Sequence, residues 1–486
     1  MQLPNREACY AIFRAKDPRF DGRLFVGVAS TGVYCRPVCR ARLPREENCT
    51  YFATAAQAEQ AGYRPCLVCR PELAPGQAPL DAASALARRA ARYLEEHCGD
   101  GLGLEEAARQ LGCTSRHLRR SFWAEYQVTP VAYLQTCRLL LAKGLLTDTA
   151  LPVVEVALAA GFGSQRRLEA LFQSRYGLTP AALRRQAAAG SACPGRFTVA
   201  LGYRPPYRWE ELLGFLEARA IAGVERVADG RYWRAVRLAG RAGRQAAGWL
   251  SVGHRPDRCQ LEVTLSESLA PALPQVLARV RRLFDLDCDP QAVGAVLEGM
   301  DRVRPGLYQP GRRVPGSFDP FETAVRAVLG QQITVKAAST LAGRLAAALG
   351  DPLETGVEGL THTFPTPAAL AALEDPPARL GPLGVTSARA RCIAALARAV
   401  EQGSLQLGPC ADPAQAQAAL LAIKGVGNWT AQYLAMRTLG EPDAFLETDV
   451  GVRRALPGFT PRQLRELAEA WRPWRSYAVI NLWNAQ

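Results

Sequence analysis

Four cysteines near the start of the chain have the spacing of a metal site. Cys35 and Cys39 lie in TGVYCRPVCR, and Cys66 and Cys69 lie in RPCLVCRPE, which gives C-x3-C, 26 intervening residues and C-x2-C. Two such pairs are typical of tetrahedral zinc sites with four thiolate ligands. Disulfide pairing is the alternative, and it suits an oxidising compartment. A purely structural zinc fits the same spacing.

The chemistry open to such a site is alkyl transfer. Four thiolates around Zn²⁺ leave a surplus of negative charge, so the metal keeps the sulfurs deprotonated while they remain nucleophilic. Arg36, Arg40 and Arg42 stand beside the first cysteine pair. Cationic side chains at these positions would attract a phosphate backbone.

The segment DGRLFVGVASTGVYCRPVCRARLPREENCTYF, together with AGYRPCLVCRPE, resembles the N-terminal domain of the Ada-type adaptive-response regulators. The resemblance implies that Cys35 accepts a methyl group irreversibly from a DNA methylphosphotriester while it stays on zinc. Cys39, Cys66 and Cys69 would be the other ligands. Because the change from thiolate to thioether removes one negative charge, affinity for DNA should rise after transfer.

A degenerate repeat follows the cysteine segment. Residues 104–130 and 153–180 share an amphipathic helix, a Gly turn, a Ser, a basic helix and a Thr-Pro ending. This order predicts two helix-turn-helix units, and residues 82–188 resemble the DNA-binding domain of AraC-type activators. A solvated basic helix face is the alternative. The DNA-facing residues implied are Ser115, Arg116, Arg119, Arg120, Ser164, Gln165, Arg166 and Arg167.

A glycine turn near the C-terminus provides a second candidate site. The stretch QAALLAIKGVGNWTAQYLAMR, residues 417–437, places Gly425 and Gly427 between two predicted helices, where backbone N–H groups can hold a phosphate. Downstream, FLETDVGVRRAL places Asp449 at the start of another predicted helix. A carboxylate there could stabilise a cationic sugar, although Thr-Asp before a helix is also an ordinary N-cap.

The hairpin and this Asp resemble the helix-hairpin-helix DNA glycosylases. Residues 197–486 resemble the alkylated-base (3-methyladenine) glycosylases of the adaptive response, through segments such as YRPPYRWEELLGFLEARA and GFTPRQLRELAEAWRPWRSYAVINLW. The resemblance implies that Asp449 is the catalytic carboxylate. It also implies that backbone carbonyls of the hairpin bind a monovalent cation, those of Leu421, Ile423 and Val426.

The same resemblance assigns a base pocket, argues against a lyase step and leaves one departure from the family. The aromatic residues implied are Phe215, Trp429, Tyr433 and Trp483, each of which could instead be a core residue. Bifunctional relatives have a Lys where this chain has Trp429, so strand cleavage through a Schiff base is not expected. Gln332 stands where the relative inserts a Leu into the gap left by the flipped base, and such wedges are normally apolar.

The positions of these motifs predict a multidomain, mainly α protein with α+β parts. We expect a four-cysteine zinc α+β domain (1–76), an AraC-type double helix-turn-helix (82–188), a small α+β domain (195–300) and an all-α helix-hairpin-helix domain (301–486). Alternating segments such as RFTVALGY and CQLEVTL predict strands in the third domain. The Pro/Gly/Ala stretches 73–79 and 187–195 are the expected linkers.

Composition supports a polyanionic partner. The net charge is +14, and each predicted portion is basic. We expect double-stranded DNA, both alkylated and operator, as the partner, with RNA polymerase as a partner of the activator unit and no membrane. The first residues lack the pattern of a secretory signal, so we expect a cytoplasmic, nucleoid-associated protein.

Together these patterns predict a monofunctional glycosylase of alkylated bases such as 3-methyladenine, joined to a methyl acceptor and a sequence-specific activator. The alternative is a transcription factor that senses DNA methylation and whose C-terminal half binds DNA without catalysis.

Overall fold

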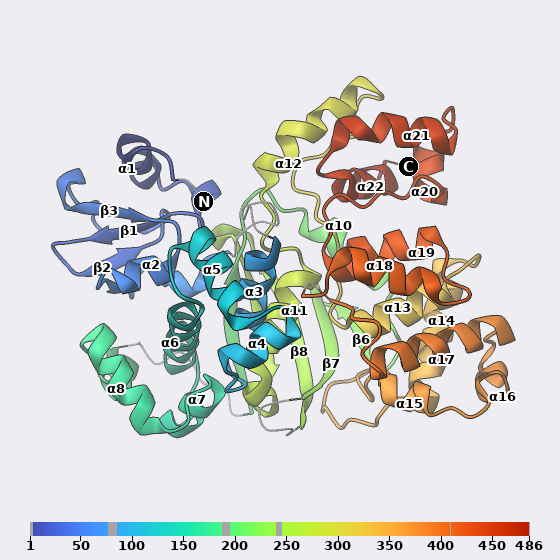
Figure 1. Ribbon diagram of the computed structural model, residues 1–486, viewed down its shortest axis with the longest axis horizontal. Helices are drawn as coiled ribbons and strands as arrows, with labels where there is room; N and C mark the ends of the chain where they lie inside the picture. Colours follow the sequence, from blue (N-terminus) through green and yellow to red (C-terminus); the bar gives the residue numbers. More distant parts are fainter. Residues whose placement is uncertain (1–2, 76–84, 187–194, 240–244, 409, 486) are drawn as a thin grey trace.

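The computed structural model describes residues 3–75, 85–186, 195–239, 245–408 and 410–485. It confirms the expected fold class, mainly helical with two small sheets. Figure 1 shows the cysteine-rich part at one side, the helix-turn-helix part below it, a sheet at the centre and the remaining helices at the other side. The expected linkers 73–79 and 187–195 lie largely outside the described residues.

The cysteine-rich part is a four-stranded sheet with helices packed on it. The strand order is β3-β1-β2-β4, with β1 antiparallel to β2 and β3, and β2 parallel to β4. Thr54 and Gln57 form a capping box that starts helix α2. The elements are α1 (Arg6–Ala15), η1 (Pro18–Phe20), β1 (Phe25–Val28), β2 (Val33–Cys35), η2 (Glu46–Asn48), β3 (Cys49–Phe52), α2 (Ala55–Gln60), β4 (Arg64–Pro65) and η3 (Pro71–Leu73).

The second part contains two helix-turn-helix units joined by one long helix. Gly112 and Gly161, both with positive φ, turn the chain before each recognition helix. Thr114 and Ser164 are the N-caps of these two helices. The elements are α3 (Ala85–Glu96), α4 (Leu104–Gln110), α5 (Ser115–Tyr126), α6 (Pro130–Asp148), α7 (Val153–Ala159), α8 (Gln165–Tyr176) and α9 (Pro180–Gln186).

The third part is an antiparallel sheet in the order β5-β9-β8-β7-β6. Strand β5 alternates exposed and buried residues, because one face of the sheet covers the core. The elements are β5 (Arg196–Gly202), α10 (Trp209–Glu217), β6 (Glu225–Ala228), β7 (Arg231–Ala239), β8 (Gln245–Arg255), η5 (Pro256–Arg258), β9 (Gln260–Ser266), η6 (Glu267–Ala272) and α11 (Leu273–Leu283).

The last part is helical, and several of its helices start with an Asp or Thr N-cap followed by Pro. Asp319, Thr366, Asp412 and Thr460 fill this role, which satisfies the free N–H groups of the first turn. The elements are α12 (Pro290–Leu297), η7 (Glu298–Arg302), α13 (Pro320–Leu329), α14 (Val335–Leu349), α15 (Pro367–Ala371), α16 (Pro376–Leu380), η8 (Gly381–Leu383), α17 (Ser387–Glu401), α18 (Pro413–Ala422), α19 (Asn428–Leu434), the π-helix η9 (Ala435–Leu439), α20 (Val450–Ala455), α21 (Pro461–Ala468), η10 (Glu469–Trp471) and α22 (Arg475–Trp483).

The helix-turn-helix part is docked on the sheet and on the last helices. Side chains of α6 to α8 belong to the same hydrophobic cluster as the sheet strands. At the rim, Arg282 donates to the Glu96 carboxylate at 2.8 and 3.0 Å, and Arg89 donates to the Cys410 carbonyl at 2.8 Å. Within the described residues, no helix is both long and apolar enough to cross a membrane.

Candidate functional site

The four cysteines of the first motif lie together. All four Sγ atoms are within 4.8 Å of one another. Sulfur atoms at 2.3 Å from one tetrahedral zinc ion would be about 3.8 Å apart, so the donor set fits a single ion. The parallel pairing of β2 with β4 brings the two cysteine pairs together, because Cys35 ends β2 and Cys66 follows β4.

Backbone hydrogen bonds distinguish the four sulfurs. The amide of Arg36 donates to Sγ of Cys69 at 3.3 Å, and the amide of Val68 donates to Sγ of Cys66 at 3.4 Å. A backbone N–H of Ala41 reaches the Cys39 thiol. Among the backbone N–H hydrogen bonds of the described residues, none ends on Sγ of Cys35. Since N–H donors stabilise a thiolate, Cys35 is left as the most electron-rich of the four.

Arg36 is buried, which disagrees with the exposed position expected of a phosphate contact. Only 6% of the surface of Arg36 is exposed. The guanidinium donates to Asp21, with Nε to Oδ1 at 2.8 Å, and to the Cys69 carbonyl at 3.1 Å. A buried guanidinium needs such a partner because an unpaired charge is costly in the interior. Arg36 therefore holds the Cys69 loop, while Arg40 and Arg42 are exposed.

The recognition helices present the expected polar side chains to solvent. Arg116, Arg119 and Arg120 of α5 are exposed, as are Arg166 and Arg167 of α8. Ser164 is exposed, whereas Ser115 and Gln165 are partly buried. The chain therefore offers two exposed basic helix faces.

Asp449 lies at the N-terminus of α20 and is held by four donors. Oδ1 accepts from the amides of Gly451 at 2.8 Å and Val452 at 3.1 Å, and from the indole Nε1 of Trp483 at 2.8 Å. Oδ2 accepts from the indole Nε1 of Trp429 at 3.0 Å, the one donor to this oxygen in the hydrogen bonds of the described residues. Because a carboxylate oxygen can accept more than one bond, Oδ2 keeps capacity for a further positive group.

The indole of Trp483 can approach only because residue 451 is glycine. A Cβ on Gly451 would lie 2.7 Å from Cδ1 of Trp483, closer than two carbon atoms can pack. The tripeptide Asp449-Val450-Gly451 thus supplies both the N-cap carboxylate and the space for the indole ring of Trp483, which donates to that carboxylate. The sequence does not indicate this role of Gly451, because Trp483 lies 32 residues further along the chain.

The four aromatic residues of the expected pocket come together around Asp449. Trp429 and Tyr433 stack with ring centroids 5.1 Å apart and planes 14° apart. Phe215 and Trp483 are nearly parallel, with centroids 6.2 Å apart and planes 9° apart. A flat base between two rings needs roughly 7 Å, so the second pair would have to open slightly to admit one.

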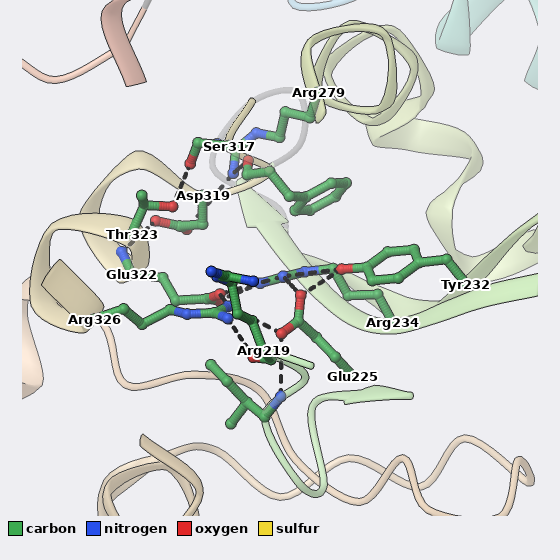
Figure 2. Close-up of polar contacts among 12 residues, drawn as sticks. Arg219, Glu225, Tyr232, Arg234, Arg279, Ser317, Asp319, Glu322, Thr323 and Arg326 are labelled. Carbon is green, nitrogen blue, oxygen red and sulfur yellow. Dashed lines mark hydrogen bonds and ion pairs between the residues drawn. The ribbon is translucent and has the colours of Figure 1, made fainter. Parts of the chain in front are cut away.

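Figure 2 shows a buried ion network that bonds Arg219, just after the end of α10, the helix that contains Phe215. Arg326 donates to Glu225 and to Glu322 at 3.0 Å each, and its other nitrogen bonds the Arg219 carbonyl. Arg234 also pairs with both carboxylates. The network joins β6 and β7 to α13, and removal of one partner of such a buried set costs about 3 to 5 kcal/mol.

Two arginines lie against the pocket aromatics. The guanidinium of Arg219 is 3.7 Å from the Phe215 centroid. Burial lowers the pKa of Arg219 to about 10, so it stays charged at neutral pH. Arg437, in the π-helix η9, donates to the Tyr433 hydroxyl at 2.6 Å and to the Gly316 carbonyl at 3.0 Å. These contacts hold the rings of Phe215 and Tyr433 in place.

The glycine hairpin lies beside the turn that carries Gln332. Gly425 and Gly427 are exposed between α18 and α19, and Gly425 has a φ of 100° that favours glycine. Gln332 is exposed at the tip of the turn between α13 and α14, with a φ of 56°. Its neighbour Gln331 donates to the Gly425 carbonyl at 2.9 Å, so the turn is tied to the hairpin.

A cavity of about 360 Å³ lies elsewhere, at the junction of the cysteine-rich part, α6 and α11. Glu72, Tyr133 and Arg281 are among its lining residues, and Asp449 is not. The cavity therefore includes neither Asp449 nor the four aromatic residues, although Arg437 lines it.

Four family models match the chain. They are "Metal binding domain of Ada" over residues 8–72, "Helix-turn-helix domain" over 107–186, "AlkA N-terminal domain" over 198–319 and "HhH-GPD superfamily base excision DNA repair protein" over 325–472. The match to a metal-binding domain and the four-cysteine cluster together support a zinc site.

Curated relatives match the whole chain and its parts. The "Probable bifunctional transcriptional activator/DNA repair enzyme AlkA" of Mycobacterium tuberculosis is 41% identical over 489 residues, which is 98% of this chain and 96% of the relative. "DNA-3-methyladenine glycosylase 2" of Escherichia coli is 40% identical over 288 residues, 59% of this chain and 96% of that protein. "Bifunctional transcriptional activator/DNA repair enzyme Ada" of Escherichia coli is 40% identical over 125 residues, 26% of this chain and 34% of that protein.

Proposed function

The chain belongs to the family of bifunctional transcriptional activator/DNA repair enzymes, and from this we infer a DNA repair glycosylase that is also an alkylation-responsive activator. Its C-terminal part hydrolyses the bond between an alkylated base, such as 3-methyladenine, and the sugar. The observation that carries the glycosylase is Asp449, held by two indole N–H groups among stacked aromatics, in a chain similar to a 3-methyladenine glycosylase.

We propose Asp449 as the catalytic carboxylate. As the glycosidic bond breaks, its electron pair neutralises the cationic base, and positive charge develops on the sugar ring. Oδ2 of Asp449, with a single donor among the described residues, stabilises that charge until water adds its OH to C1′ and releases a proton. Trp429 occupies the hairpin position of a lyase Lys, so no Schiff base forms and the strand stays intact.

We propose that Phe215, Trp429, Tyr433 and Trp483 hold the flipped base. An alkylated purine is planar and electron-poor, so it stacks well on electron-rich rings. Gly425 and Gly427 present backbone N–H groups to a phosphate, and Gln332 fills the space left in the duplex. Carbonyls of the same hairpin bind a monovalent cation, those of Leu421, Ile423 and Val426.

The glycosylase is tested on duplex DNA treated with a methylating agent. Free 3-methyladenine should appear, while the strand breaks only after alkali, because the enzyme leaves an abasic site. Strand nicking without alkali would contradict the monofunctional assignment, and the absence of free base would contradict the glycosylase itself.

We propose Cys35 as the methyl acceptor. Its Sγ attacks the methyl carbon of a methylphosphotriester, the S–C bond forms as the O–C bond breaks, and the electron pair stays on the phosphate oxygen. Zinc bound by Cys35, Cys39, Cys66 and Cys69 supplies the charge that keeps the thiolates deprotonated. No backbone N–H of the described residues donates to Sγ of Cys35, which supports it as the nucleophile.

Mass spectrometry tests the acceptor. After incubation with methylphosphotriester DNA, a gain of about 14 Da should map to Cys35. Cys49 is a buried free cysteine outside the cluster, so Cys49→Ser is the matched control for Cys35→Ser. Methylation of another ligand would overturn the assignment.

The helix-turn-helix part completes the proposal. Exposed Arg40 and Arg42 contact phosphates near the acceptor, and α5 and α8 enter successive major grooves through Ser115, Arg116, Arg119, Arg120, Ser164, Gln165, Arg166 and Arg167. At its operator the protein recruits RNA polymerase, and it works on nucleoid DNA. In this proposal the methyl acceptor is the domain 1–76, the operator-binding unit is the domain 82–188, and the glycosylase consists of the domains 195–300 and 301–486.

A further inference from the structure

Helix α2 of the cysteine-rich part contacts the C-terminal ends of both recognition helices. The side-chain amide of Gln57 donates to the carbonyl of Tyr126, the last residue of α5, at 3.1 Å. The hydroxyl of Tyr176, the last residue of α8, donates to Oε1 of Glu59 at 2.9 Å. One short helix therefore bridges both DNA-reading elements.

Glu59 is the centre of the second contact. It is only 4% exposed, and its carboxylate also accepts from Tyr34 Oη at 3.1 Å and Thr136 Oγ1 at 3.1 Å. Arg175 of α8 donates to the Glu59 carbonyl at 3.2 Å. Donors thus converge on one residue from β2, from α6 and from α8, which is the arrangement that a buried carboxylate needs.

Gln57 is equally constrained. Its Oε1 accepts from the amides of Ala53 at 2.8 Å and Thr54 at 3.2 Å, which fixes the side chain before its nitrogen reaches Tyr126. The contact to α5 is therefore part of the start of α2 itself.

The two recognition helices otherwise pack in different hydrophobic clusters. Leu118 and Phe122 of α5 belong to a cluster with α3 and α4, whereas Leu168 and Phe172 of α8 belong to the cluster shared with the central sheet. Helix α6 connects the two units along the chain. A second, lateral connection would restrict how far they can rotate about α6.

We propose that α2 is a clamp that sets the spacing and angle of α5 and α8, with Glu59 and Gln57 as its positioning residues. The proposal rests on the proposed operator binding and adds the element that fixes its half-site spacing. Because Tyr34 precedes Cys35 on β2, the methyl-acceptor strand is one residue away from the clamp.

The clamp can be tested without DNA on the full-length, zinc-loaded protein. Spin labels on non-canonical amino acids at Ala124 of α5 and Ala170 of α8, both exposed, report the distance between the helices. Such labels avoid the 14 cysteines. Glu59→Ala should broaden the distance distribution, and so should Tyr176→Phe, which removes only a hydroxyl. Gln60→Ala, at an exposed position on the same helix, should leave it unchanged.

A spacing assay gives the functional readout. The probe is the duplex that methylated wild-type protein selects from a random pool. One extra base pair between its half-sites rotates one site by about 35°, so wild-type affinity should fall roughly tenfold, and the clamp variants should lose much of that penalty. Retention of the wild-type distance distribution by both Glu59→Ala and Tyr176→Phe would overturn the clamp. If no duplex is selected, operator binding fails, while the distance measurement still decides the clamp.

Discussion

Replacement of Asp449 by Asn separates the catalytic role of this carboxylate from its structural one. Asn is as good an N-cap as Asp, so α20 should still start at Val450. The amide oxygen can take the place of Oδ1, with its three donors, which directs the amide NH₂ toward the indole N–H of Trp429. One hydrogen bond is lost, and the free energy of unfolding should fall by only about 1 kcal/mol.

The effect on catalysis should be far larger. A carboxylate at about 4 Å from a unit positive charge contributes about 4 kcal/mol at the effective dielectric constant of about 20 that suits a partly exposed group. Loss of this interaction should slow base release about 10³-fold.

The measurement is single-turnover release of 3-methyladenine from methylated duplex DNA, with thermal unfolding in parallel. Trp429→Phe is the matched variant, since it removes the donor from Oδ2 but keeps the ring and the charge, and it should slow release by about tenfold. If Asp449→Asn releases base within tenfold of wild type while it stays folded, the carboxylate does not stabilise the transition state and the reasoning is wrong.

Three further perturbations follow from particular contacts. Gln331→Leu removes the bond to Gly425 and should slow base release on duplex DNA roughly tenfold but leave release from single strands unchanged; equal slowing on both would contradict a role in duplex insertion. Burial raises the pKa of Glu59 to about 7 from 4.5, so its contribution to stability is full below pH 4.5 and falls by about 3 kcal/mol as the pH rises to 7; Glu59→Gln should flatten this part of the denaturation profile, and an unchanged slope would contradict it. Chelation of zinc should abolish methyl uptake by Cys35 yet leave base release intact, because the cysteines belong to a hydrophobic cluster separate from those around Asp449; parallel loss of both activities would contradict that independence.

The features that the sequence predicts correctly depend on short-range patterns. The spacing within each cysteine pair can be recognised as that of metal ligands without knowledge of the fold. The pairing of β2 with β4 then brings the sulfurs of the two pairs together. Asp449 precedes a helix in the chain and is its N-cap in the structure. The spacing within each cysteine pair and the position of Asp449 before its helix involve residues close together in the chain, so a single sequence is enough to recognise them.

The features that the sequence does not predict are pairings between distant residues. Arg36 looks like a phosphate contact because it follows Cys35, but its partner Asp21 lies in another loop. Nothing in the neighbourhood of Glu59 indicates that Tyr176 will reach it. The indole N–H of Trp483 on Asp449 is hidden for the same reason, since aromatic residues are recognised by their rings and not by their single polar atom.

Helix α3 packs against α11 and against the segment before α18. This interface affects whether the gene could be divided into two. Glu96 and Arg282 pair across it, and Phe172 shares a core with Val199. If the chain were divided between the activator part and the repair part, each fragment would expose apolar surface and a charged side chain without its partner. Co-expressed, they should reassemble in trans, whereas either fragment alone should be prone to aggregate; fission of such a gene would therefore need compensating surface changes.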